Sequence, residues 1–131
     1  MISAYNLGAL FDPQLGGDNL ALIDCRDWDN PREYSHRELE DMGNACPRGL
    51  ADRGLVRGDS VAILSANRAE FLISYLGILR AGMTAVPISY KFPNELVDFV
   101  LQDASVKHVF CDGPRRGAFS ADLPVTNFDT A

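Results

Sequence analysis

Residues 60–64 read Ser-Val-Ala-Ile-Leu, a continuous apolar run of strand length that follows the turn signal Arg57-Gly58-Asp59. A strand without polar alternation is buried on both faces, which is typical of the centre of a parallel sheet covered by helices. This run therefore predicts an α/β fold, in which the neighbouring segments alternate between strands and helices.

The segments on either side of this run show that alternation. Helices are indicated where apolar residues recur every three or four positions, and strands where short apolar runs are bounded by turn residues. The expected elements are a strand at 19–25, a helix that starts at Ser35 and ends before Gly54, a helix from Asn67 to Gly82, a strand at 84–88, a helix opening at Asn94-Glu95, a strand at 107–111, a short helical turn after 112–114, and a last strand at 124–128.

Local features within these elements carry their own expectations. Ser35 and Glu38 fit a capping box, so a helix should start there. Pro47 should kink this helix or divide it into two shorter helices, because proline removes a backbone hydrogen bond. Gly77 should allow a neighbouring element to approach closely. Pro87 should lie near a strand end or at a bulge, because it cannot donate to a sheet ladder.

The order of elements predicts an α/β class with a doubly wound, mostly parallel sheet and helices on both faces, because crossovers between parallel strands are right-handed. The strand at 19–25 is expected to join this sheet. A length of 131 residues favours a single domain, residues 1–131, in which the pattern is weakest over residues 113–131.

Composition excludes several classes of protein. The chain carries 12 Lys+Arg against 18 Asp+Glu, a formal charge of −6, which argues against nucleic-acid binding. No run approaches the roughly 18 apolar residues that a membrane span needs, and the N-terminus lacks a basic signal-peptide region, so we expect a cytoplasmic protein without a membrane span. Cys25, Cys46 and Cys111 are too far apart to suggest a metal site, and we expect three buried, reduced thiols.

Candidate binding residues lie where the expected strands end, because ligands of open α/β sheets bind beyond the carboxyl ends of the strands. The stretch 65–67 enters a helix and could hold an anion, although capping of the helix by Asn67 is the favoured interpretation. Asp24, Asp27 and Asp112 could form a magnesium pocket, but we interpret them as solvated strand ends. Neither G-x-x-x-x-G-K-[ST] nor G-x-G-x-x-G is present.

Other polar and aromatic residues predict no chemistry. His36 and His108 have no serine or cysteine nucleophile beside them in this arrangement and are expected to be structural or solvent-facing. Trp28 and Tyr34 flank a polar loop, which we expect them to pin to the sheet. The residues alone therefore predict no catalytic group and no metal site.

Two stretches resemble known family motifs. Residues 34–39 (Tyr-Ser-His-Arg-Glu-Leu) resemble the first core motif of the adenylate-forming acyl-CoA synthetases, also called AMP-binding ligases. Residues 79–88 (Leu-Arg-Ala-Gly-Met-Thr-Ala-Val-Pro-Ile) resemble the family's Leu-Lys-Ala-Gly-x-x-x-Val-Pro motif. The segments 54–64 and 67–71 between them and 89–96 after them are also similar, although Ser89 stands where relatives usually have Asn or Asp. The resemblance covers about Leu20 to Asp112.

The resemblance implies an N-terminal subdomain of a synthetase, inactive alone, because the family's phosphate loop, ATP-binding segments, hinge aspartate and catalytic lysine all lie downstream. The intact enzyme would use Mg-ATP to convert a carboxylic acid to an acyl-adenylate and then transfer the acyl group to CoA, as in fatty acid metabolism. Its partners would be the remainder of the synthetase and, through exposed apolar surface, a second copy.

Lys91 is the one candidate site residue, because the matching basic position in some relatives lies near the CoA phosphates, and lysine is a suitable point-charge partner for phosphate. The competing interpretation is a solvated turn lysine.

Two other classes of protein stay open. The first is a complete small α/β binding or interaction module, either a degenerate synthetase remnant or a flavodoxin-like domain. The second, a freestanding nucleotide-binding enzyme, ranks last because the sequence holds no phosphate loop.

Overall fold

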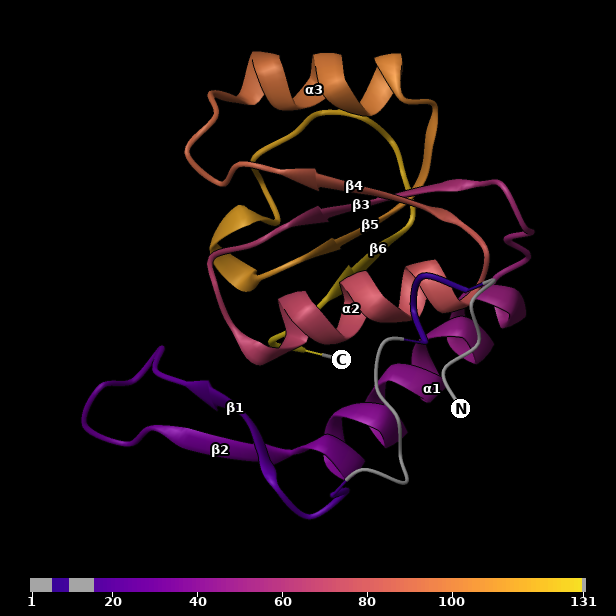
Figure 1. Cartoon of the computed structure of the whole chain (residues 1–131). Helices are drawn as coiled ribbons and strands as arrows, with labels where there is room; N and C mark the ends of the chain where they lie inside the picture. Colours follow the sequence, from indigo (N-terminus) through magenta and orange to yellow (C-terminus); the bar gives the residue numbers. More distant parts are fainter. Residues whose placement is uncertain (1–5, 10–15, 131) are drawn as a thin grey trace.

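A computed structural model describes residues 6–9 and 16–130 (Figure 1). These residues form a two-stranded sheet of order β1-β2 and a four-stranded sheet of order β4-β3-β5-β6. The elements in chain order are β1 Leu20–Asp24, β2 Arg32–Ser35, α1 His36–Asp52, β3 Ser60–Leu64, α2 Ala69–Arg80, β4 Thr84–Ile88, α3 Asn94–Asp103, β5 Val106–Cys111, the short 3-10 helix η1 Gly113–Arg115, and β6 Val125–Asn127.

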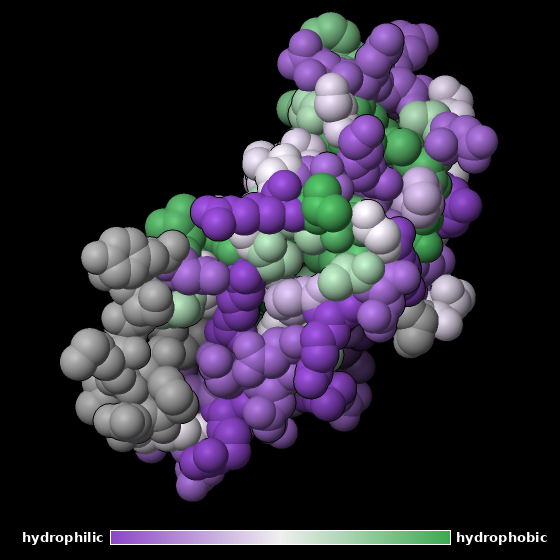
Figure 2. Space-filling view, turned by 90° about the vertical axis from the view of Figure 1, so that its right-hand side faces the viewer, coloured by the Kyte–Doolittle hydropathy of each residue, from purple (hydrophilic) through white to green (hydrophobic). Residues whose placement is uncertain are grey.

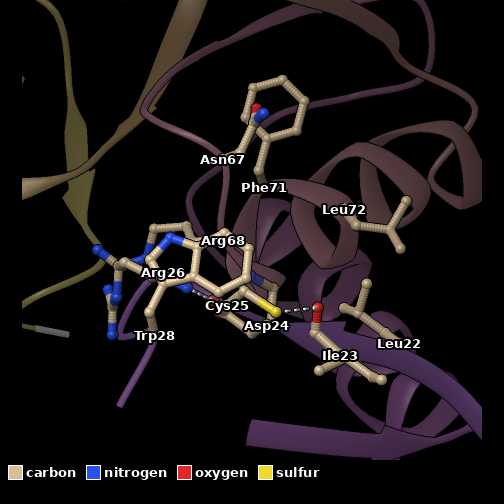
Figure 3. A pocket seen from close by; sticks show the side chains of 11 residues that line it. Leu22, Ile23, Asp24, Cys25, Arg26, Trp28, Asn67, Arg68, Phe71 and Leu72 are labelled. Atoms are coloured by element: carbon tan, nitrogen blue, oxygen red, sulfur yellow. Dashed lines mark hydrogen bonds between the residues drawn. The ribbon is translucent and has the colours of Figure 1, made fainter. Parts of the chain in front are cut away.

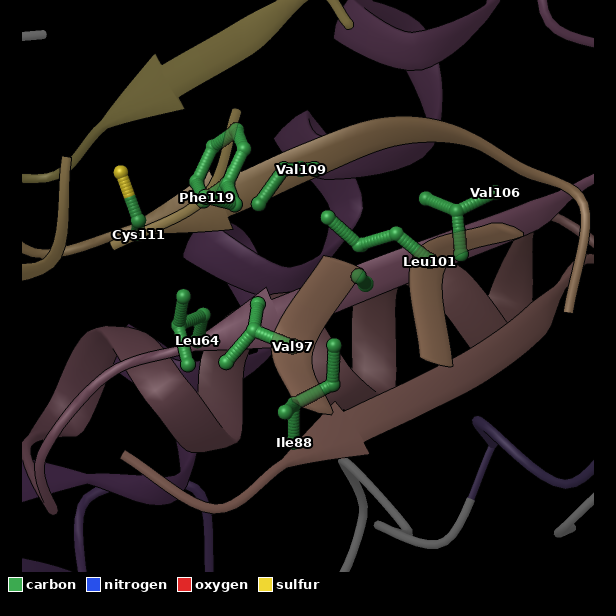
Figure 4. Packing of buried hydrophobic residues seen from close by; sticks show 9 residues of the cluster. Leu64, Ile88, Val97, Leu101, Val106, Val109, Cys111 and Phe119 are labelled. Carbon is green, nitrogen blue, oxygen red and sulfur yellow. The ribbon is translucent and has the colours of Figure 1, made fainter. Parts of the chain in front are cut away.

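The four-stranded sheet is parallel throughout, and β3 lies inside it between β4 and β5. All of β3 after its first residue is buried, as its unbroken apolar sequence predicts. On one face Val97 and Leu101 of α3 pack against a cluster that includes Leu64 and Val109 (Figure 4). On the other face Leu50 of α1 and residues of α2 cover the sheet. The predicted parallel sheet with helices on both faces is confirmed.

The first strand does not join this sheet. It pairs antiparallel with β2, a strand that the sequence pattern did not predict, and the resulting hairpin extends away from the larger sheet in Figure 1. Only Tyr34 of β2 is buried, so its sequence shows no strand periodicity. Trp28, in the hairpin loop, is 82% exposed and therefore pins nothing, which corrects that expectation.

Helix α1 begins with the predicted capping box, in which Ser35 Oγ accepts from the Glu38 N–H and the Glu38 carboxylate accepts from the Ser35 N–H. Gly54 follows the helix with a φ of +84°. Pro47 lies inside one continuous helix, so the alternative of two shorter helices is wrong. Buried residues before and after Pro47, including Leu39 and Leu50, hold the helix together across it.

Helix α2 begins at Ala69, one residue later than it would if Asn67 were its capping residue, as the sequence predicts. Arg68, not Asn67, occupies the capping position, and the Arg68 side chain makes no capping hydrogen bond. The Ala69 N–H instead donates to Asp24 Oδ2 at 2.8 Å, so the cap comes from the end of β1. Gly77 lies where α2 crosses α1, and a Cβ there would meet the Cys46 Cβ at 2.4 Å. This confirms the close approach expected at Gly77.

The structure also tests what the sequence predicts for Pro87 and for the three cysteines. Pro87 is the penultimate residue of β4, which is paired only with β3 among the described strands. Cys25, Cys46 and Cys111 are all free, and Cys111 is buried as expected, whereas Cys25 and Cys46 are only half-buried. Burial raises the pKa of the Cys46 thiol to about 11, which keeps it protonated. Among the described helices, none is long and apolar enough to cross a bilayer.

Candidate functional site

The centre of the carboxyl edge of the sheet is a buried aspartate. Asp112 directly follows β5, and Asp112 Oδ2 accepts from the Ala66 N–H at 3.0 Å and from Arg115 Nη1 at 2.9 Å. Asp112 Oδ1 accepts from the Arg115 N–H at 3.2 Å, which starts η1. Because Asp112 is only 3% exposed, its interpretation as a solvated strand end is wrong. This carboxylate joins the ends of β3 and β5 and fixes Arg115.

A second ionic group lies beside the first, around Arg68. Its side chain is 5% exposed and contacts Glu70 and Asp129, each at 2.8 Å. The hydrogen bond from Arg68 lowers the pKa of the Glu70 carboxyl, although burial acts in the opposite direction. Asp129 Oδ2 also accepts from the Gly113 N–H at 2.6 Å. Arg68 thus ties the start of α2 to the last residues that the structure describes.

The three aspartates considered for magnesium do not converge. Burial raises the pKa of Asp24, but hydrogen bonds from the Ala69 and Arg26 N–H groups outweigh it and leave that pKa below its usual value. Asp27 accepts from the Asp29 N–H inside the hairpin loop. Within the described part of the chain, no group of three or more His, Cys, Asp or Glu could hold a metal ion. These residues do not fit a magnesium site.

A cationic aromatic cluster lies at the same edge, where β4 and β5 end. The Arg115 guanidinium lies 4.7 Å from the centroid of the Tyr90 ring, and Lys91 Nζ lies 5.8 Å from it. Tyr90 is 40% exposed and Lys91 is exposed. Lys91 therefore follows a strand's carboxyl end as expected, but the sequence analysis did not place Arg115 beside it. The available signal was the basic pair Arg115-Arg116, which is separated from the strand by residues 112–114.

A pocket of about 450 Å³ opens between the hairpin and the start of α2 (Figure 3). Its walls are mostly apolar and come from β1 and from Phe71 and Leu72 of α2. Asn67 lines this pocket, so the stretch considered for anion binding borders an apolar hollow. Two N–H groups at this stretch already have carboxylate acceptors, because the Ala66 N–H donates to Asp112 and the Ala69 N–H donates to Asp24.

His108 confirms its structural interpretation. It is 1% exposed on β5, and its Nε2 lies 2.8 Å from Thr126 Oγ1 on β6. Burial lowers the pKa of His108 to about 4, with a further contribution from the positive charge of Arg53. The imidazole is therefore neutral around pH 7, and it joins two strands rather than taking part in chemistry.

This neutral histidine predicts an acid-dependent loss of stability. Its pKa is about 4 in the folded chain and 6.5 in the unfolded chain, so the unfolded state binds the proton first as the pH falls. The contribution of neutral His108 to the free energy of unfolding should be complete above pH 6.5. It should decline by about 3 kcal/mol as the pH falls towards 4. Urea unfolding of the chain and of His108→Leu across this window measures it. The variant should show a flatter pH dependence than the unmodified chain, and equal slopes for the two chains would contradict the prediction.

The described residues form an α/β domain around a parallel four-stranded sheet, and comparison with known proteins identifies its family. The sequence model of the family described as AMP-binding enzyme matches residues 13–129. The chain therefore belongs to the AMP-binding enzyme family. The resemblance to adenylate-forming enzymes that the motifs indicated is confirmed.

Individual relatives agree with this assignment. The chain is 34% identical over 98 residues to bacitracin synthase 1 of Bacillus licheniformis, covering 75% of this chain and 2% of that protein. It is 31% identical over 80 residues to the long-chain-fatty-acid–CoA ligase FadD13 of Mycobacterium tuberculosis, covering 61% of this chain and 16% of the ligase. The N-terminal subdomain of NpsA from Klebsiella oxytoca, in complex with 3-hydroxybenzoyl-AMSN, superposes with a TM-score of 0.81 at 25% identity, covering 99% of this chain and 33% of that one. The architecture is thus that of an N-terminal subdomain of this family, and the chain spans only a small part of the length of these relatives.

Proposed function

We propose that this chain is a single domain, residues 1–131, that serves as the N-terminal subdomain of an acid–CoA ligase. The intact enzyme would activate a carboxylic acid with ATP to an acyl-adenylate and pyrophosphate, and would then transfer the acyl group to CoA. The match to the AMP-binding family over residues 13–129 is the observation that carries the proposal. The match to a fatty-acid–CoA ligase favours the CoA branch.

The described residues take a supporting part in this reaction. They hold neither a phosphate-loop motif nor a convergent set of carboxylates, so they do not fit ATP phosphates or magnesium. A further polypeptide would supply those groups. An apolar groove of about 270 Å³ between α1, α2 and the sheet is lined by Leu50, Phe110 and Phe128. The groove lies beside β6, which is paired only with β5 among the described strands. We assign this groove and strand edge to the remainder of the synthetase.

Lys91 is the proposed contact with CoA. Its ammonium group and the Arg115 guanidinium flank the same tyrosine ring, so two positive charges face the carboxyl edge in a chain of net charge −6. Phosphate groups are the ligands that such a pair favours, because arginine offers a planar fork of donors and lysine a compact charge. Asp112 holds the arginine in place through its carboxylate.

Lys91→Ala in the full-length enzyme should raise the KM for CoA about tenfold and leave acyl-adenylate formation unchanged, since the loss of one charge-assisted contact to phosphate is about 1.5 kcal/mol. Pyrophosphate exchange measures the first half-reaction, and thioester formation at varied CoA measures the second. Lys107→Ala is the matched control, because this exposed lysine lies near the start of β5. It is therefore at the opposite end of that strand from Arg115. An unchanged KM for CoA would remove Lys91 from the site.

The function itself is tested by reading the source gene past the codon for Ala131 and assaying the encoded protein. A Ser/Thr/Gly-rich loop ending in Lys-Gly, together with ATP–pyrophosphate exchange that depends on a carboxylic acid, supports the proposal. A stop codon at that point and no exchange would favour a complete binding module. The match to bacitracin synthase 1 favours a second candidate, in which the activated acid passes to an acceptor other than CoA. Acid-dependent exchange without any CoA thioester would select that candidate.

A further inference from the structure

The outer face of α3 carries large apolar side chains that nothing in the described structure covers. The inner face of this helix is closed, because Val97 and Leu101 are buried against the sheet. Phe92, Leu96 and Phe99 are 40%, 38% and 60% exposed. We refer to these three residues as the α3 stripe. Figure 1 shows α3 as the outermost layer on its side of the sheet.

The α3 stripe is continuous along the helix. Leu96 and Phe99 are three residues apart in α3 and are therefore neighbours on one face, and Phe92 lies two residues before the helix begins at Asn94. Single exposed apolar residues are ordinary, but two phenylalanines and a leucine on the face opposite the core are not needed for folding. Figure 2 shows hydrophobic surface among hydrophilic groups at the top of the molecule, where α3 lies. A helix that carries exposed apolar residues besides its buried face is suited to a second contact.

Acidic residues accompany the stripe along α3. Glu95 and Asp103 are the exposed ones whose side chains have no described partner, since Asp98 accepts hydrogen bonds from Ser120 and Ala121. The helix sequence, Asn-Glu-Leu-Val-Asp-Phe-Val-Leu-Gln-Asp, holds three acidic residues and no basic one. Asp103 is the last residue of α3, is exposed, and lies one turn beyond Phe99. A carboxylate at a helix C-terminus is repelled by the helix dipole, so Asp103 destabilises the isolated helix. A cation placed beside Asp103 and Glu95 would reverse that cost.

We propose that the α3 stripe binds an amphipathic helix of a partner protein, whose apolar face is flanked by lysines and arginines. Helix-on-helix docking uses apolar anchors at this spacing, and opposite charges at the rim fix the orientation and speed the encounter. A second copy of the chain is a poorer occupant, because two acidic α3 helices would repel each other. An anionic membrane surface is a poorer one for the same reason.

The test uses the whole chain and a synthetic helix with leucines along one face and lysines on both sides, measured by fluorescence anisotropy. The matched probe carries glutamates in place of the lysines. Phe99→Ala should weaken binding of the lysine probe about tenfold, whereas Val56→Ala, at an equally exposed apolar residue outside α3, should not change it. Asp103→Lys should weaken binding, whereas Asp52→Lys, at the last residue of α1, should not. The glutamate probe should bind neither the unmodified chain nor Phe99→Ala.

Each other outcome overturns the proposal. Equal binding by Phe99→Ala and Val56→Ala would remove the α3 stripe from the contact. Sedimentation that shows a dimer of the unmodified chain, lost in Phe99→Ala, would assign the stripe to a second copy. Flotation with phosphatidylserine vesicles that is lost in the same variant would assign it to a membrane. Melting curves of all variants confirm that each is folded.

Discussion

Asp112→Ala should lower the free energy of unfolding by about 3 kcal/mol, because it removes a buried carboxylate and leaves its partners without an acceptor. The side chain is 4% exposed and holds the Ala66 N–H together with the Arg115 guanidinium. Alanine would leave the Ala66 N–H buried without its partner and would free Arg115 from its position over Tyr90. Urea unfolding monitored by circular dichroism at pH 7 gives the change.

Two further variants separate the causes of this loss. Asp112→Asn keeps an oxygen for the Ala66 N–H but removes the charge that pairs with Arg115, so it should cost about half as much. Asp122→Ala removes an exposed carboxylate and should stay within about 0.5 kcal/mol of the unmodified chain. An Asp112→Ala chain as stable as Asp122→Ala would show that the buried carboxylate contributes nothing. In the full-length enzyme, loss of Asp112 should also raise the KM for CoA if Arg115 contacts its phosphates.

The parallel sheet could be predicted because its signal is local. The run at 60–64 is apolar throughout, and the helices that follow it repeat their apolar residues at helical spacing. The hairpin could not be predicted in the same way, because β2 is four residues long and buries only Tyr34. A short polar strand is defined by its partner, and the partner lies on the far side of a loop.

The wrong predictions for Asn67 and Asp112 have a common physical origin. Asn67 is among the best capping residues, yet the carboxylate that binds the start of α2 comes from Asp24, 45 residues away in the sequence. Asp112 follows a strand, where a polar residue is usually solvated, but Arg115 folds back over it in the next turn. Local patterns report propensity, whereas these two contacts depend on which strand ends meet in space.

Arg80→Ala should have the largest effect on stability, about 4 kcal/mol, because one guanidinium joins three segments of the chain. Its side chain is 8% exposed. Arg80 Nη2 lies 2.6 Å from Glu40 Oε2, Nη1 donates to the Glu40 carbonyl oxygen at 3.2 Å, and Nε donates to the Gly8 carbonyl oxygen at 2.7 Å. Space for it depends on Gly43, where a Cβ would lie 2.6 Å from Arg80 Nη1. The arginine of the motif at 79–88 thus locks α2 to α1.

Arg80→Lys distinguishes this geometry from simple charge. Lysine can keep the ion pair with Glu40 but cannot reach the carbonyl oxygens of Gly8 and Glu40 at once, so it should recover only about half of the loss. Arg53→Ala is the matched control, because the Arg53 side chain has a single described hydrogen bond, to the Gly49 carbonyl oxygen, and the residue is exposed. In Arg80→Ala with Glu40→Gln, the combined loss should be smaller than the sum of the single losses, since both remove the same contact. Strict additivity would mean that Arg80 and Glu40 do not stabilise each other, and full recovery by lysine would mean that the positive charge suffices without the guanidinium geometry.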